Sequence, residues 1–143
     1  MSGTSIVYRT ARGELTLSWA APSVLVFEYE GYADGSFIDF IDRVWNDCFP
    51  DGSFPVQVFV DTERQTGAAS EFRTKLMAWA RRVLPRTDVY CLLVKSRWVA
   101  MGISIVRATM GLSAAHVEVT TSREVFGAKL ADAIRRSTMC ASA

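Results

Sequence analysis

The residues best suited to chemistry lie in the segment Asp61–Ser70. An apolar strand, Val56–Val60, is expected to stop at Asp61, and a loop rich in hydroxyl residues then leads into an amphipathic helix. Carboxylates and hydroxyls that follow a buried strand stand where open α/β sheets place ligands and regulatory residues. The pattern therefore predicts a site along this loop, with the candidate residues Asp61, Thr62, Thr66, Gly67 and Ser70.

Enzymatic chemistry has little support in the sequence. Asp61, Glu63 and Arg64 could form an acid pair or a substrate clamp, but general acid–base catalysis needs groups that converge on one pocket, and adjacent loop residues rarely do so. The chain lacks a glycine-rich phosphate loop, a Gly-x-Ser-x-Gly elbow and a His-Glu-x-x-His motif. We therefore expect a non-enzymatic protein without a cofactor.

Cysteine and histidine usage excludes a disulfide framework and a metal centre. Cys48, Cys91 and Cys140 are odd in number and widely spaced, which is typical of reduced thiols. His116 has no second histidine with which to complete a metal site. Both residue types are expected to be structural.

Length and charge limit the class of protein. A chain of 143 residues is expected to form a single domain over residues 1–143, with a core at about 5–136 and a frayed tail at 137–143. A formal net charge of +1 provides no field that attracts nucleic acid. The apolar runs are broken by Lys95, Arg97 and Arg107 before they could span a membrane, and no signal peptide begins the sequence. We expect a cytoplasmic protein.

Hydrophobic periodicity places these residues on a mixed sheet. Ser5–Thr10 and Glu14–Ala20 flank a turn and predict an antiparallel hairpin, and the third strand begins at Val24. Helical spacing starts at Asp34 and ends at Pro50. Further segments then follow: the strand Val56–Val60, a helix after Ser70 that Pro85 stops, the strand Val89–Val94, a helix at Trp98–Met110, the strand Ala115–Thr120 and a terminal helix from Ser122.

The fold class follows from this order. The continuous apolar run Val89–Val94 is typical of a parallel strand covered on both faces. Together the segments predict an α/β fold, with a mixed sheet, an N-terminal antiparallel hairpin, parallel central strands and about four helices.

The predicted helix Trp98–Met110 is apolar almost all the way round. Such a helix is either buried on two sides or presents an apolar surface to a partner. Methionine adapts to varied partners, and tryptophan is enriched at interfaces. Both interpretations remain open for its residues Trp98, Val99, Met101, Ile103 and Met110.

The element order and the segment Val58–Phe72 resemble the STAS domain of bacterial anti-sigma-factor antagonists, in particular its divergent SEC14-like branch. In that family a strand ends in aspartate, and a serine nine residues later is phosphorylated by a partner anti-sigma kinase. Ser70 stands nine residues after Asp61 in this chain. The flanking residues Ala69, Glu71 and Phe72 differ from the family's Asp-Ser-Ser-Gly-like run.

Two roles are open for the hydroxyls before the second helix. Ser70 or Thr66 could cap the helix by accepting a hydrogen bond from a first-turn N–H. Alternatively, Ser70 is a switch: a phosphate there would add a charge of about −2 near a helix N-terminus, where it is tolerated, and would change the surface that a partner meets.

We therefore expect an interaction module of bacterial signalling whose partner is a protein, for example an anti-sigma-factor-like kinase, with homodimerisation left open. Its surface would comprise the loop, the start of the second helix and the apolar helix. An alternative is a carrier or sensor of a lipid or another apolar small molecule, which the SEC14-like resemblance implies. The surface residues outside the apolar helix are Asp61, Gly67, Glu71 and Arg73.

Overall fold

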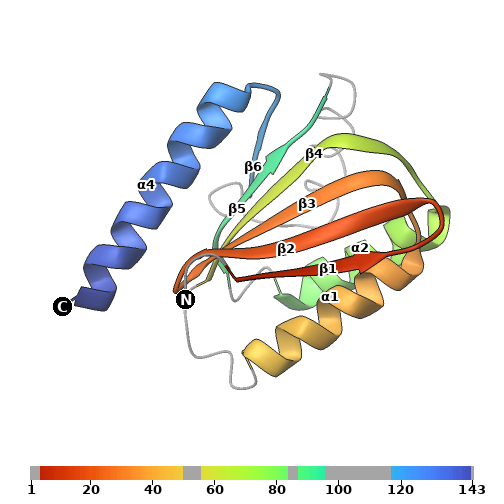
Figure 1. Ribbon diagram of the computed structural model, residues 1–143, viewed down its shortest axis with the longest axis horizontal. Helices are drawn as coiled ribbons and strands as arrows, with labels where there is room; N and C mark the ends of the chain where they lie inside the picture. Colours follow the sequence, from red (N-terminus) through yellow and green to blue (C-terminus); the bar gives the residue numbers. More distant parts are fainter. Residues whose placement is uncertain (1–3, 50–55, 84–86, 96–116, 143) are drawn as a thin grey trace.

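The computed structural model describes residues 4–49, 56–83, 87–95 and 117–142. These residues form one six-stranded sheet in which the spatial order of the strands equals their order in the sequence (Figure 1). The strands are β1 (Ser5–Arg9), β2 (Gly13–Ala21), β3 (Val24–Ala33), β4 (Val56–Ala68), β5 (Thr87–Leu93) and β6 (Val117–Thr120).

The sheet is antiparallel at one side and parallel at the other. β1, β2 and β3 form an antiparallel meander, and β3, β4, β5 and β6 pair in parallel. β5 lies between β4 and β6 and pairs in parallel with both. The prediction that this apolar run forms a central parallel strand is therefore confirmed. The mixed sheet with an antiparallel entry is confirmed.

Three helices lie in the described residues, whereas the sequence predicted about four. They are α1 (Gly35–Cys48), α2 (Ser70–Val83) and α4 (Arg123–Ser142). The predicted helix Trp98–Met110 falls outside the described residues. α1 begins where expected, because the Asp34 carboxylate accepts a hydrogen bond from the Ser36 amide at 2.9 Å.

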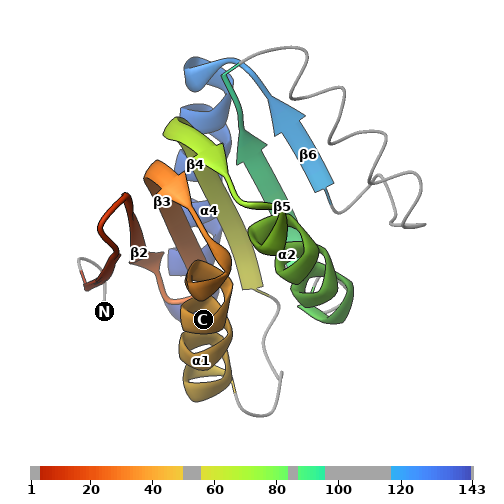
Figure 2. The same cartoon turned by 90° about the vertical axis from the view of Figure 1, so that its right-hand side faces the viewer.

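Helices cover both faces of the sheet. α1 and α2 lie on one face and α4 lies on the other (Figures 1 and 2). The strand alternation divides the core accordingly: in β4, Val58 and Val60 belong to the cluster under α1 and α2, whereas Phe59 belongs to the cluster under α4. Two separate apolar cores therefore share one sheet.

β4 is much longer than the sequence suggested. The strand does not stop at Asp61 but continues to Ala68, because β3 also extends to Ala33 and provides backbone partners along this length. Shifts in register accompany the extension between Glu28 and Glu30 and again after Gly31. The predicted loop is thus the second half of the strand, in which the residues are half-buried or exposed and none is fully buried.

The predicted fraying of 137–143 is also wrong for its described residues. α4 continues to Ser142, and the Ser137 side chain is buried. Its hydroxyl accepts a hydrogen bond from the Ser23 amide at 3.1 Å and lies 2.8 Å from the Ser23 hydroxyl. The local sequence of the tail could not indicate this contact, because Ser23 lies 114 residues away.

Candidate functional site

The extension of β4 separates residues that the sequence placed in one loop. Strands rise about 3.3 Å per residue, so Asp61 and Ala68 lie roughly 20 Å apart along β4. Asp61, Thr62 and Glu63 stand beside the start of α4, whereas Gly67 and Ser70 stand at the start of α2. The candidate residues therefore lie in two separate regions of the surface. We call the region of Asp61, Thr62 and Glu63 the first place and the region of Gly67 and Ser70 the second place.

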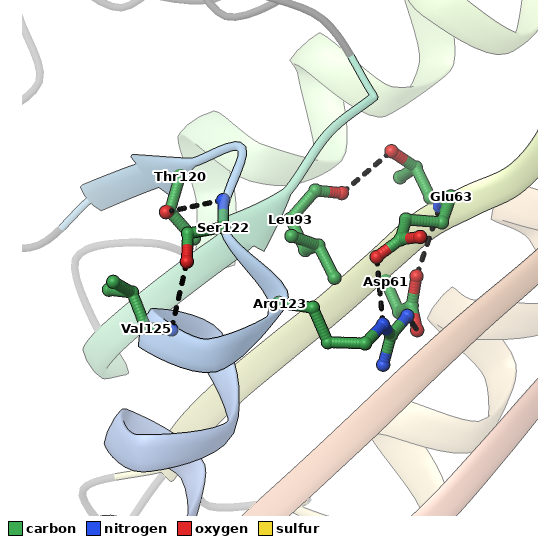
Figure 3. Close-up of polar contacts among 8 residues, drawn as sticks. Asp61, Glu63, Leu93, Thr120, Ser122, Arg123 and Val125 are labelled. Atoms are coloured by element: carbon green, nitrogen blue, oxygen red, sulfur yellow. Dashed lines mark hydrogen bonds and ion pairs between the residues drawn. The ribbon is translucent and has the colours of Figure 1, made fainter.

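The first place is an ion-pair cluster between β4 and α4 (Figure 3). Arg123 donates from Nη2 to Asp61 Oδ2 at 2.6 Å and from Nε to Glu63 Oε1 at 2.8 Å. Asp61 also accepts from the Glu63 amide at 3.0 Å, and its side chain is only 15% exposed. The two carboxylates raise the pKa of the Arg123 guanidinium, mainly through the hydrogen bond that Arg123 donates to Asp61.

The hydroxyls at this place have structural partners. Thr62 donates to the Leu93 carbonyl at 2.8 Å, which ties β4 to β5. The terminal helix starts at Ser122 as predicted, and the Ser122 hydroxyl caps α4 by accepting from the Val125 amide at 3.2 Å (Figure 3). The first place therefore acts as a clamp that holds the start of α4 against the sheet.

The sequence interpretation missed Arg123, which lies 62 residues from Asp61. One signal was present: a cation in the first turn of a helix opposes the helix dipole. Nearby carboxylates would stabilise such a cation, and Asp61 and Glu63 are the acidic residues that follow the buried part of β4. Only the crossover topology shows that these particular acids meet Arg123.

The second place is the start of α2. The Ala69 carbonyl accepts the first helical bond, from the Arg73 amide at 3.3 Å, so Ala69 and not Ser70 occupies the cap position. Thr66 lies in β4. The predicted side-chain cap is wrong for both hydroxyls, because the Ala69 amide bonds to the Ala33 carbonyl at 2.9 Å and the strand pairing itself positions the helix start.

Ser70 is exposed, and charged and aromatic side chains lie at neighbouring positions of the chain or contact these positions. Glu71 lies over Gly35, where an added β-carbon would be 2.6 Å from the Glu71 carboxylate. Arg73 is exposed and forms no ion pair with any described residue. Gly67 lies against the ring of Tyr32, on which the Arg12 guanidinium stacks at 3.9 Å.

The other candidates are outside the described residues or away from both places. Trp98, Val99, Met101, Ile103, Met110 and His116 are not described. Cys48 is exposed at the end of α1, and Cys91 is buried in β5, where burial raises the pKa of its thiol to about 11. Over the described ranges, no group of acidic, histidine and cysteine side chains could hold a metal ion.

One hollow lies between α1 and the sheet. Its cavity volume is about 10 Å³, which is room for a single water molecule. The lining is apolar and includes Trp19, Trp45 and Phe49. This hollow is too small for a lipid.

None of the described helices is long and apolar enough to cross a membrane.

No family model and no curated protein matches the chain. Among solved structures, the chain is similar to an uncharacterized DUF3478-family protein with a SpoIIAA-like fold from Shewanella loihica PV-4. The TM-score is 0.62 at 7% sequence identity, and the alignment covers 91% of this chain and 95% of that chain. The chain is also similar to the anti-sigma factor antagonist SpoIIAA in its unphosphorylated form, with a TM-score of 0.60 at 13% identity, and the alignment covers 85% of this chain and 97% of that chain.

The protein has a SpoIIAA-like fold. The STAS-like domain predicted from the element order is thereby confirmed at the level of fold. Within this SpoIIAA-like fold, β4 leads to the start of α2, where Ser70 stands exposed.

Proposed function

We propose that the chain, as a single domain over residues 1–143, is a non-enzymatic protein-interaction module of bacterial signalling. The observation that carries this proposal is the SpoIIAA-like fold with an exposed serine in the first turn of α2. One of the solved structures that share the fold is that of an anti-sigma factor antagonist. We accordingly expect a protein partner, for example an anti-sigma-factor-like kinase.

Ser70 is the preferred regulatory hydroxyl of the three candidates. Thr62 is half-buried and donates to the Leu93 carbonyl, so its modification would break a contact between strands. Thr66 is exposed but lies in β4. The Ser70 hydroxyl forms no hydrogen bond with any described residue, so a phosphate there would change the surface without breaking the fold.

The docking surface proposed around Ser70 combines Gly67, Glu71 and Arg73. Arg73 is a cation without an ion-pair partner among the described residues, so it is available to a carboxylate of a docked protein or to a phosphate on Ser70. Asp61 is excluded from this surface, since it is largely buried beneath Arg123 at the other place. The proposed surface is therefore smaller than the one predicted from the sequence.

Two variants of Ser70 test the proposal. Ser70→Ala removes a hydroxyl without a partner and should change the free energy of unfolding by less than about 0.5 kcal/mol. Ser70→Asp places a negative charge at the positive end of α2, so the protein should remain equally stable while partner capture falls. Thermal melts and quantitative pull-downs from native extract measure both effects.

Ala78→Asp is the matched control, because it adds the same charge at an exposed position about two turns further along α2. It should leave partner capture unchanged. Equal capture by wild type, Ser70→Asp and Ala78→Asp would contradict the proposed surface. A co-purified lipid detected by native mass spectrometry, with no protein captured, would favour the apolar-ligand carrier instead.

A further inference from the structure

α4 is attached to the sheet by less apolar surface than α1 and α2 are. It buries Phe126 and Ala133 fully and Leu130 and Ile134 in part. Apolar burial is the main favourable term in packing, and small side chains contribute little of it. On the opposite face, α1 and α2 bury larger side chains, namely Phe37, Ile38, Phe40, Ile41, Trp45, Phe72, Trp79 and Val83.

Polar contacts supplement the packing of α4 at both ends. Arg123 joins the first turn to Asp61 and Glu63, and Ser137 bonds to Ser23 near the last turns. Arg123 is 59% exposed, and ion pairs at such positions contribute little free energy because water screens them. The attachment is thus the sum of several weak contacts.

The helix itself contains a weak point. Gly127 lies in the second turn of α4, and a β-carbon added there would meet nothing within 4 Å. Glycine inside a helix is less stable than alanine because it loses more backbone freedom on folding. No packing contact with a described residue requires glycine here, so Gly127 lowers the stability of α4.

We propose that α4 is a strap that opens from the sheet as one unit while the sheet, α1 and α2 remain folded, with the contacts of Arg123 to Asp61 and Glu63 as its latch. Folded proteins open locally in cooperative units whose cost is below that of global unfolding. Opening of α4 uncovers one apolar face of the sheet, which includes Phe59, Cys91 and Leu93. This inference does not depend on the proposed function.

Cys91 reports on the opening. Its side chain is fully buried in the cluster under α4. The thiolate is the nucleophile that attacks an alkylating reagent, and burial both blocks access of the reagent and keeps the thiol protonated at neutral pH. In a Cys48→Ser, Cys140→Ser background, the rate of Cys91 alkylation by iodoacetamide therefore measures how often the strap is open.

The first experiment removes the latch. Arg123→Ala should speed Cys91 alkylation about twofold to fivefold without urea, since the opening equilibrium no longer has to break two partly exposed ion pairs. Arg135→Ala is the matched control, because among the described residues Arg135 pairs only with Asp132 within α4, and its loss should leave the rate unchanged. Equal rates in Arg123→Ala and the parent protein would overturn the latch.

The second experiment separates strap opening from global unfolding. Ile41→Val weakens only the core under α1 and α2, so it should lower global stability and leave Cys91 alkylation in the absence of urea unchanged. The alkylation rate should also depend weakly on urea at low concentrations, because the open state exposes less surface than the unfolded chain. Alkylation that follows global unfolding in both respects would overturn the strap.

Discussion

The face of the sheet under α1 and α2 contains aromatic rings in contact with one another, whereas the face under α4 contains mostly small aliphatic side chains. Trp79 lies 5.5 Å from Trp45 and 6.3 Å from Phe27, measured between ring centroids. Under α4 the described aromatic pair is Phe59 with Phe126, at 5.8 Å. The same strands thus support one firmly packed face and one lightly packed face.

This difference in packing indicates that the two faces contribute unequally to the free energy of unfolding. Aromatic residues bury the largest apolar areas and gain from ring contacts, so the face under α1 and α2 dominates the free energy of unfolding. The face under α4 depends on fewer apolar contacts together with ion pairs and hydroxyls. Variants placed on the two faces should therefore behave differently.

The largest effect is expected on the aromatic face. Phe37 is fully buried between Tyr8 and Tyr29, so Phe37→Ala should lower the free energy of unfolding by about 4 kcal/mol, through lost burial and the cavity left behind. Urea denaturation measures the loss. A cost below about 1 kcal/mol would remove the contrast between the faces.

The corresponding truncation under α4 should cost less. Phe126 is buried but contacts one aromatic ring among the described residues, so Phe126→Ala should cost about 2 to 3 kcal/mol, at the low end for a buried phenylalanine. The alkylation rate of Cys91 should also rise in Phe126→Ala, and it should rise less in Phe37→Ala. Equal stability losses in the two variants would show that the faces are alike.

Alkaline pH provides a prediction for Cys91. Burial raises the pKa of this thiol from 9.0 to about 11, so its contribution to stability is fully present below pH 9 and is lost as the pH rises toward 11. Tyr29 and Tyr90 have raised pKa values too, so the test is a difference. Between pH 9 and 11, wild type should lose about 2 kcal/mol more stability than Cys91→Ala. Parallel pH profiles would contradict it.

The smallest expected effect is a gain. Gly127→Ala should stabilise the protein by about 0.5 to 1 kcal/mol, because alanine is the better helix former and its β-carbon meets no neighbour. Differential scanning calorimetry measures the shift in Tm. A loss of stability would mean that the α4 backbone at this position differs from an ordinary helix.

At the candidate site, the sequence pattern predicted the start of a helix but not the contacts of the individual hydroxyls. Helical spacing identified the start of α2 close to Ser70, and the exposed position of this residue agrees with a surface role. The same pattern could not show that Ala69 takes the cap position, because the bond from its amide to the Ala33 carbonyl depends on the pairing of β3 with β4. The ranking of Ser70 above Thr62 likewise needed the contact of Thr62 with Leu93.

The sequence alone determined the order and type of most described elements, because apolar periodicity and caps such as Asp34 and Ser122 act over a few residues. It placed the second half of β4 in a loop. The tertiary structure decided how far β4 extends, since a strand continues where a neighbour offers backbone partners, and β3 does so as far as Ala33. It also decided which charges meet, because Arg123 reaches Asp61 only once the sheet and the crossover bring distant segments together.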